Sequence, residues 1–166
     1  MSAAAAADLA SRCVADYVER RDLPIADGPT LRAKKFVPVN EARGRVYLAG
    51  PFFNLQQRRL IEEVLAILES AKLKVISPLH DIGHGSAKVV ARADLAALRS
   101  CDRVFAILEG CDPGTLFEVG YARAKGIPVF AYTETVTNEN LTMFIGSGCH
   151  VFSDLVTTIY RTKWKR

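Results

Sequence analysis

The sequence lacks the patterns that mark a membrane span, a secretory leader or a nucleotide-phosphate loop. No apolar run approaches the roughly 20 residues that cross a bilayer as a helix. The first 21 residues have no basic segment, and Asp8 interrupts them. The glycine-rich patterns G-x-G-x-x-G and G-x-x-x-x-G-K-[ST] are both absent, which argues against dinucleotide binding and P-loop chemistry. We therefore expect a cytoplasmic protein that does not associate with membranes.

The four cysteines form no C-x-x-C pair and no zinc-ligand spacing, so we expect reduced thiols. His80, Asp81 and His84 suggest a metal site at first sight. However, Gly83 and Gly85 make it improbable that the two histidines share one face of a helix, and no third ligand is close in sequence. We interpret this segment as a loop that lines a pocket, and we expect neither a metal nor another cofactor.

Positive charge is concentrated at one end of the chain. The net charge is +4, and the last six residues, RTKWKR, carry four positive charges, so the remainder is neutral overall. A short basic tail is more typical of a solvated end than of a binding surface. The charge distribution therefore does not predict binding to a nucleic-acid polymer.

A chain of 166 residues is long enough to bury one sizeable core. The Ala-rich start predicts a helix with Leu9, Cys13 and Tyr17 on one apolar face. Residues 22–44 are interrupted by proline and glycine, which indicates a linker or an arm on the surface. We predict an N-terminal helix and arm over residues 1–43 and a catalytic domain over residues 44–166.

From residue 44 onward, short apolar segments alternate with segments of helical periodicity. The expected strands cover residues 45–50, 73–78, 102–108, 127–132 and 149–152. The expected helices cover residues 55–72, 89–101, 114–126 and 153–161. This alternation predicts an α/β fold with a doubly wound, mostly parallel five-stranded sheet and flanking helices, of the Rossmann or flavodoxin type. Ligands bind such sheets beyond the carboxyl ends of the strands.

Several unusual residues fall at those strand ends. After the first strand, Phe52 and Phe53 could form a stacking wall for a flat ligand, or could pack under the next helix. Within that strand, the hydroxyl of Tyr47 needs a partner if it is buried, and a carboxylate is a natural one. Asp94 lies in a predicted helix and Asp102 directly follows it, and each could also be an ordinary surface or capping residue.

The segment Asp112–Glu118 opens a predicted helix and has two interpretations. Thr115 and Glu118 have the spacing of a capping box, in which each satisfies the other's backbone amide. Asp112 is an equally good cap, so the segment contains two carboxylates where one would suffice. Paired carboxylates are suited to glycosidic-bond chemistry, in which one attacks or stabilises the sugar carbon. A helix N-terminus would keep Glu118 ionised for this role.

Four motifs, in this order, resemble the nucleoside 2-deoxyribosyltransferase family and its N-glycoside hydrolase relatives. They are V-Y-L-A-G-P-F-F, D-L-x-x-L-x-x-C-D, D-P-G-T-L-F-E-V-G-Y-A and N-L-T-M, within residues 44–160. The resemblance implies a compact, doubly wound α/β domain. It also implies that Glu118 attacks the anomeric carbon, that Tyr47 orients Glu118, and that Asp94 binds the base and helps to protonate the leaving nitrogen.

The same resemblance implies that Asp112 holds sugar hydroxyls and that Asn140 completes the pocket of a neighbouring subunit. The protein would then be a homodimer or larger homo-oligomer with shared active sites. In this sequence Thr142 lengthens the N-L-M form of that motif. The substrate-binding residues expected on these grounds are Gly50, Pro51, Phe52, Phe53, His80, Asp112, Gly114, Asn140, Met143 and Ser147.

Three functions remain open from the sequence. The first is a 2-deoxyribosyltransferase that moves the sugar of a small-molecule nucleoside to another base through a covalent glutamyl intermediate. The second is an N-glycoside hydrolase that releases free base from a nucleoside or its 5′-monophosphate. The third is a nucleotide-binding module without catalysis, against which the set of Tyr47, Asp94, Asp112 and Glu118 argues.

Overall fold

The computed structural model describes residues 1–20, 23–36, 44–83 and 85–164. The chain divides into two compact units, Met1–Asn40 and Glu41–Arg166. The predicted boundary after residue 43 lies beside residues outside the described ranges, and the assignment of residues 44–166 as a catalytic domain stays a prediction. No helix within the described ranges is long and apolar enough to cross a membrane. The four cysteines, all within those ranges, are free thiols.

The N-terminal unit contains two helices, α1 (Ala3–Arg20) and α2 (Gly28–Ala33). The predicted first helix is confirmed, but the prediction of a linker over residues 22–44 is wrong where α2 lies. The side chain of Asp27 caps α2 by accepting a hydrogen bond from the amide of Thr30 at 2.9 Å. A glycine and a proline directly after a cap are compatible with the first turn of a helix, which is why this short helix resembles a linker in sequence.

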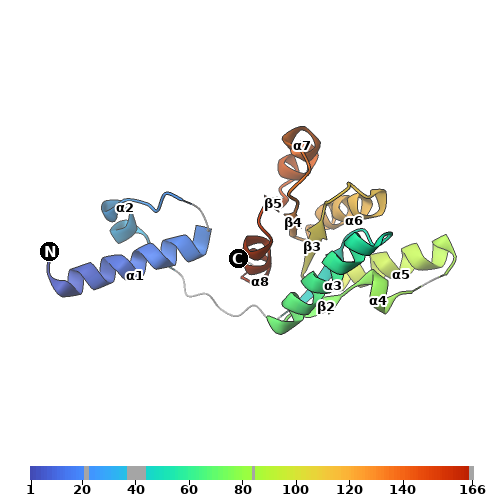
Figure 1. The fold of residues 1–166 in the computed structure, drawn as a ribbon, viewed down its shortest axis with the longest axis horizontal. Helices are drawn as coiled ribbons and strands as arrows, with labels where there is room; N and C mark the ends of the chain where they lie inside the picture. The colour runs from blue at the N-terminus through green and yellow to red at the C-terminus, as the bar shows by residue number, and fades with distance from the viewer. Residues whose placement is uncertain (21–22, 37–43, 84, 165–166) are drawn as a thin grey trace. The chain divides into compact units, whose positions relative to one another are not determined.

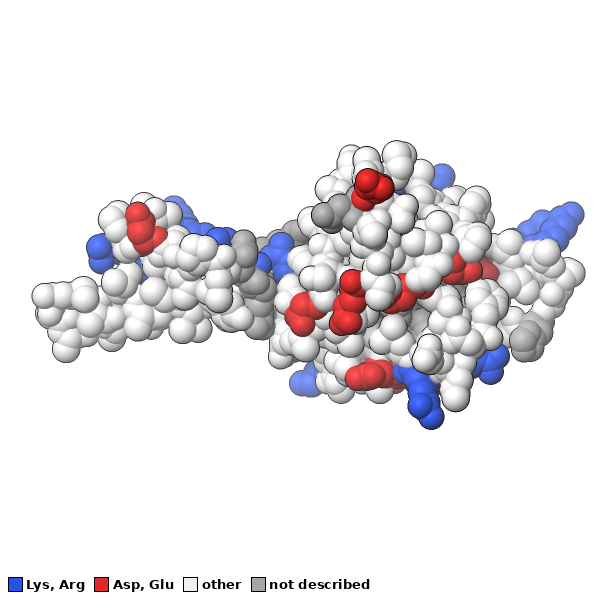
Figure 2. Space-filling model, turned by 45° about the horizontal axis from the view of Figure 1, so that its top comes forward, with Lys and Arg blue, Asp and Glu red and all other residues white. Residues whose placement is uncertain are grey.

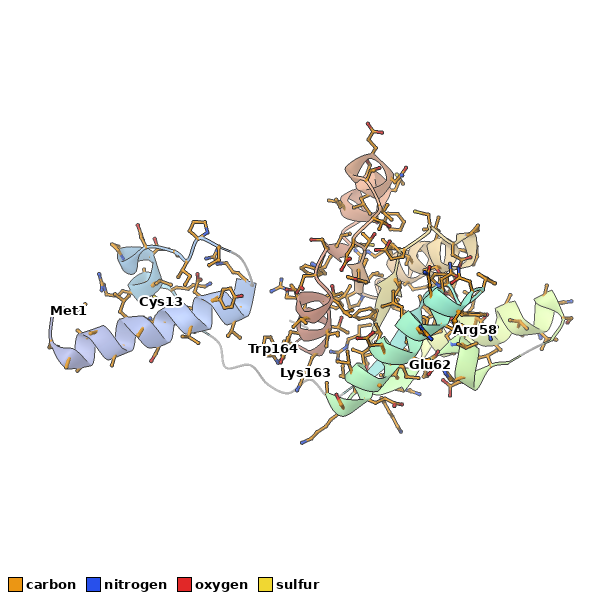
Figure 3. The ribbon with its side chains drawn as sticks, viewed as in Figure 1. Met1, Cys13, Arg58, Glu62, Lys163 and Trp164 are labelled. Atoms are coloured by element: carbon orange, nitrogen blue, oxygen red, sulfur yellow. The ribbon has the colours of Figure 1, made fainter. Side chains whose placement is uncertain are left out.

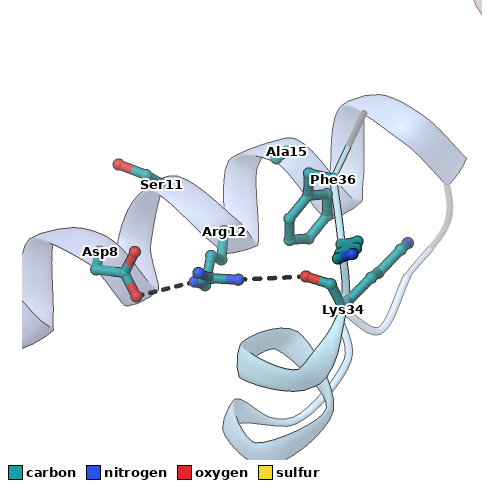
Figure 4. Close-up of a pocket in the computed structure, with 7 residues that line it drawn as sticks. Asp8, Ser11, Arg12, Ala15, Lys34 and Phe36 are labelled. Atoms are coloured by element: carbon teal, nitrogen blue, oxygen red, sulfur yellow. Dashed lines mark hydrogen bonds and ion pairs between the residues drawn. The ribbon is translucent and has the colours of Figure 1, made fainter. Parts of the chain in front are cut away.

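Polar contacts join α1 to α2 and the residues that follow it. The buried residue of α1 is Asp16, whose carboxylate pairs with Arg20 at 2.5 Å and Lys34 at 2.8 Å. Figure 4 shows Arg12 between Asp8 and the carbonyl oxygen of Lys34, in a shallow pocket of this unit. Because Arg12 and Lys34 are already bonded within the unit, we assign these cations a structural role.

The second unit alternates strands and helices (Figure 1). Its strands are β1 (Arg45–Ala49), β2 (Lys74–Ile76), β3 (Arg103–Ile107), β4 (Val129–Tyr132) and β5 (His150–Phe152). Its helices are α3 (Leu55–Ser70), α4 (Pro78–Asp81), α5 (Ala87–Arg99), α6 (Pro113–Ala124), α7 (Asn138–Gly146) and α8 (Leu155–Lys163). The predicted elements are therefore present, with small shifts at their ends. The segment interpreted as a loop after the second strand begins instead with the short helix α4.

The five strands are parallel and lie in the order β2-β1-β3-β4-β5. The chain winds from β1 outward to β2, then returns to the other side of β1 and continues through β3 and β4 to β5. This order confirms the predicted doubly wound α/β fold. The direction of winding reverses between β1 and β3, and a crevice forms at the carboxyl ends of those two strands.

Alternate residues of the central strands enter two separate cores. Val46 and Leu48 of β1 belong to the core on the face covered by α3 and α8. Tyr47 and Ala49 belong to the opposite core, which α5 and α6 cover. All five residues of β3 are buried: the four apolar residues that follow Arg103, and Arg103 itself. The strand period of two thus directs Tyr47 toward the helix face that carries α6.

Gly50 directly follows β1, at a point where a side chain has no space. A Cβ built there would lie 2.8 Å from Cδ1 of Ile61 and 3.1 Å from Cβ of Ile107. We expect Gly50→Ala to lower the free energy of unfolding by about 1–3 kcal/mol because the core must be overpacked to accept the methyl group. Chemical denaturation measures this change.

Gly120 provides the matched control, because a Cβ built there in the middle of α6 meets nothing within 4 Å in the described structure. We expect Gly120→Ala to raise the free energy of unfolding by about 0.5–1 kcal/mol through helix propensity. Equal effects at the two positions would contradict the close packing assigned to Gly50.

Candidate active site

A pocket of about 120 Å³ opens at the crevice beyond the carboxyl ends of β1 and β3. Its lining comes from the segment after β1 and from helices α4, α5 and α6. The lining residues are Gly50, Phe52, Phe53, Pro78, Asp94, Asp112, Gly114, Thr115 and Glu118. Three carboxylates therefore converge at the place where this fold binds ligands.

A short hydrogen bond joins Glu118 to the central strand. The Tyr47 hydroxyl donates to Oε1 of Glu118 at 2.6 Å, across 71 residues of sequence. Tyr47 is fully buried, and burial together with the neighbouring Glu118 charge raises the pKa of its hydroxyl far above the ordinary value. Tyr47 therefore keeps its proton and acts only as a donor to the carboxylate. Glu118 is the carboxylate partner that the sequence predicts for a buried Tyr47.

Burial controls the ionisation of Glu118. Loss of hydration raises the pKa of its carboxyl group to about 7, although the Tyr47 hydrogen bond lowers it; the nearby charges of Asp94 and Asp112 add to the rise. Burial therefore opposes the expected effect of the helix N-terminus, which is to keep Glu118 ionised. The helix dipole acts mainly within the first turn, and Glu118 lies beyond the first turn of α6.

Asp94 projects from α5 with an incomplete set of hydrogen bonds. Its Oδ1 atom is buried and has no hydrogen-bond partner in the part of the chain that the structure describes. Burial raises the pKa of this carboxyl group, which favours its protonated form. A buried, unsatisfied carboxyl group in a pocket is costly unless a ligand completes its hydrogen bonds.

Asp112 is the N-cap of α6. Its Oδ2 atom accepts hydrogen bonds from the backbone amide of Thr115 at 2.7 Å and from the Thr115 hydroxyl at 2.9 Å. The Thr115–Glu118 capping box considered from the sequence is therefore not formed. Asp112 takes the capping role, and Glu118 is left to bond with Tyr47.

The aromatic turn after β1 is held by the first turns of α3. The rings of Phe52 and Phe53 stack with their centroids 5.2 Å apart, and both side chains line the pocket. Gln57 accepts a hydrogen bond from the amide of Phe53 at 2.9 Å. Arg58, labelled in Figure 3, donates from Nε to the carbonyl oxygen of Phe52 at 2.9 Å. The turn is thus braced with Phe53 exposed, and the stacking of these rings on a ligand stays a prediction.

His80 does not belong to the pocket lining. Its ring nitrogens lie 2.9 Å from the Ser77 hydroxyl and 2.9 Å from Oε1 of Glu62. Its neighbour Pro78 occupies the lining instead. A substrate-binding role for His80 stays a prediction, and His84 lies outside the described residues.

Figure 2 shows acidic side chains gathered across one face of the second unit, with Lys and Arg toward its margins. Among the described residues that line the pocket, the three charged ones are all carboxylates. Arg58, on α3, donates to the backbone carbonyl of Phe52. The ionisable groups that line the pocket are thus all acidic.

The family model described as nucleoside 2-deoxyribosyltransferase matches residues 46–152, which include the pocket-lining residues named above. The chain belongs to the nucleoside 2-deoxyribosyltransferase family. The resemblance inferred from the four motifs is thereby confirmed. A comparison of the chain with curated proteins found no match.

The similarity of the chain to solved structures is consistent with this family assignment. The chain is similar to a 2-deoxyribosyltransferase from Bacillus psychrosaccharolyticus, with 28% identity, a TM-score of 0.57, and coverage of 69% of this chain and 90% of that one. A 2-deoxyribosyltransferase from Leishmania mexicana has 20% identity and a TM-score of 0.57, covering 74% and 99% of the two chains. The CMP N-glycosidase BcmB from Clostridium botulinum has 21% identity and a TM-score of 0.54, covering 71% and 97%. The last two support the fold alone.

The family resemblance also assigned Asn140, Met143 and Ser147 to the site, and the structure places all three on or directly after α7. None of them lines the pocket of the same chain. Asn140 and Ser147 are exposed, and the Met143 side chain is 78% exposed. Their contribution to the pocket of a neighbouring subunit stays a prediction.

The pocket contains two residues that the sequence did not single out as ligand-binding, Pro78 and Thr115. Pro78 follows β2, so its position at a strand end was the available signal. Thr115 was considered only as a capping residue.

Proposed function

We propose that this protein is a nucleoside 2-deoxyribosyltransferase that uses Glu118 as its nucleophile. The observation that carries the proposal is the buried Tyr47–Glu118 hydrogen bond at the wall of a pocket that Asp94 also lines. Tyr47 fixes one carboxylate oxygen, which leaves the other available to attack. A pKa of about 7 allows Glu118 to be ionised at neutral pH while it remains a better nucleophile than an ordinary carboxylate.

In the first step, the Glu118 carboxylate forms a C–O bond to the anomeric carbon of a deoxynucleoside as the C–N bond to the base breaks. The electron pair of that bond goes to the leaving nitrogen, which takes a proton. Asp94 supplies this proton, because its buried carboxyl group favours the protonated form. The phenylalanine wall holds the base while the sugar is esterified.

In the second step, the nitrogen of another base attacks the anomeric carbon and displaces the Glu118 carboxylate. The proton lost by the incoming base returns to Asp94, so the site regains its starting state. In an N-glycoside hydrolase, water would replace the incoming base in this step. An unphosphorylated nucleoside is the proposed substrate because the charged residues that line the pocket are carboxylates.

Product analysis tests this function directly. The protein is incubated with deoxynucleosides, ribonucleosides and their 5′-monophosphates, with and without a second base, and the products are separated by chromatography. A transferase forms a new deoxynucleoside, and added base suppresses the release of free sugar. Free sugar that is insensitive to added base would indicate a hydrolase, and tight binding without turnover would indicate a binding module.

A further inference from the structure

Thr115 lines the pocket and is the only one of its lining residues to donate two hydrogen bonds to a pocket carboxylate in the described structure. Its side chain is buried, with 2% of its surface exposed. Both its backbone amide and its hydroxyl bond to the same atom, Oδ2 of Asp112. The other carboxylate oxygen of Asp112, Oδ1, has no hydrogen-bond partner among the described residues.

Gly114 leaves the space beside the same oxygen free. A Cβ built on Gly114 would lie 3.1 Å from Oδ2 of Asp112, closer than an ordinary contact. The carboxylate of Asp112 is therefore held against the first turn of α6 by two donors, and glycine at position 114 leaves room for it there. This arrangement restricts rotation of the carboxylate, so that its two oxygens are not equivalent.

The cap itself is a repeated local motif. Asp-x-x-Thr opens three helices in this chain, at residues 27–30, 112–115 and 154–157. In the other two, the amide of Thr30 bonds to Asp27 at 2.9 Å and that of Thr157 bonds to Asp154 at 2.6 Å. The repetition shows that the motif is sufficient for capping, and that the copy in α6 has the additional property of lining a pocket.

We propose that Thr115 is a positioning residue that commits Oδ2 of Asp112 to the helix cap and presents Oδ1 to a hydroxyl group of the sugar. This inference rests on the proposed function. Thr115 itself need not touch the substrate; it acts through the orientation of Asp112. A fixed carboxylate oxygen is more effective than a rotating one because its orientation is settled before the sugar binds.

The test compares three variants on three sugars. Thr115→Val removes the hydroxyl with little change in shape, and Thr115→Ser retains it. Thr157→Val removes a threonine hydroxyl in the same way at the equivalent position of α8. The substrates are a 2′-deoxynucleoside and its analogues that also lack the 3′-hydroxyl or the 5′-hydroxyl. Thermal unfolding of each variant checks that α6 remains folded.

We expect Thr115→Val to lower kcat/KM for the complete deoxynucleoside by about tenfold, the range for one hydrogen bond to a charged group. The loss should fall to less than about twofold for the analogue that lacks the hydroxyl held by Asp112. Thr115→Ser should restore activity, and Thr157→Val should have no effect on it. A purely structural role would lower activity equally for all three sugars.

An equal loss on every sugar, failure of serine to restore activity, or no loss at all would overturn the inference. These outcomes differ from a failure of the proposed function, which would appear as absence of turnover by the wild-type protein. In that case the same three sugars are compared by calorimetric binding to the wild type and to Thr115→Val. A weaker affinity confined to one sugar would then support the role of Thr115, and equal affinities would reject it.

Discussion

Glu118→Gln is expected to lower the rate of N-glycosidic bond cleavage by about 10⁴-fold or more, because an amide cannot form the ester with the anomeric carbon. The substitution preserves the size of a buried side chain and removes the cost of ionising it. We therefore expect a folded variant whose thermal stability above pH 7 is equal to or greater than that of the wild type. Steady-state kinetics and thermal unfolding measure the two effects.

The matched control is Glu63→Gln, an exposed glutamate on α3, which should leave the activity unchanged. A 2-fluoro deoxynucleoside, which slows the second step, should leave a covalent adduct on the peptide that contains Glu118. The adduct should be absent from Glu118→Gln. Full activity in that variant, or an adduct on another residue, would disprove the assignment of the nucleophile.

Tyr47→Phe should lower activity at neutral pH by about 10–100-fold through the loss of one hydrogen bond to a carboxylate. The Tyr47 hydroxyl stabilises the ionised form of Glu118 and lowers the pKa of that carboxyl group. Its removal raises this pKa further above about 7, so fewer molecules carry the carboxylate at a given pH. Because the nucleophile must be ionised, activity should rise with pH, and the midpoint of the rise should move to higher pH in the variant.

The pH profile distinguishes this effect from a general loss of structure. The deficit of Tyr47→Phe should be greatest below pH 7 and should diminish at higher pH, where both proteins are ionised at Glu118. Tyr121→Phe is the control. Tyr121 lies on α6, the helix that carries Glu118, but its hydroxyl accepts a hydrogen bond from Arg99, which does not line the pocket. An unchanged midpoint in Tyr47→Phe would show that Tyr47 does not control the ionisation of Glu118.

The sheet could be predicted from the sequence because its signal is local. Each strand is a short apolar segment, each crossover has helical periodicity, and the parallel arrangement follows from their alternation. The partnership of Tyr47 with a carboxylate could also be predicted, since a buried hydroxyl requires a partner. The choice of Glu118 as that carboxylate came from the family resemblance. It also came from the rule that ligands bind beyond the carboxyl ends of parallel strands, where residues distant in sequence meet.

The capping of α6 could not be decided from the sequence because two valid motifs overlap there. Asp112 can cap with Thr115, and Thr115 can cap with Glu118, at the same spacing. The outcome depends on whether Glu118 has a better partner, and that partner lies 71 residues away in β1. The raised pKa of Glu118 was missed for a related reason, because burial is a property of the whole fold and the helix dipole is local.

The double use of Asp112 has a consequence for changing the sugar that the protein accepts. Asp112 holds the first turn of the helix that carries Glu118, and its carboxylate also faces the pocket. Substituting Asp112 to alter sugar preference would also remove a cap, which typically costs about 1 kcal/mol when the new residue is alanine. Designed variants with altered preference should therefore keep a capping side chain at position 112, such as Asn or Ser, and obtain their new contacts from another lining residue, such as Pro78.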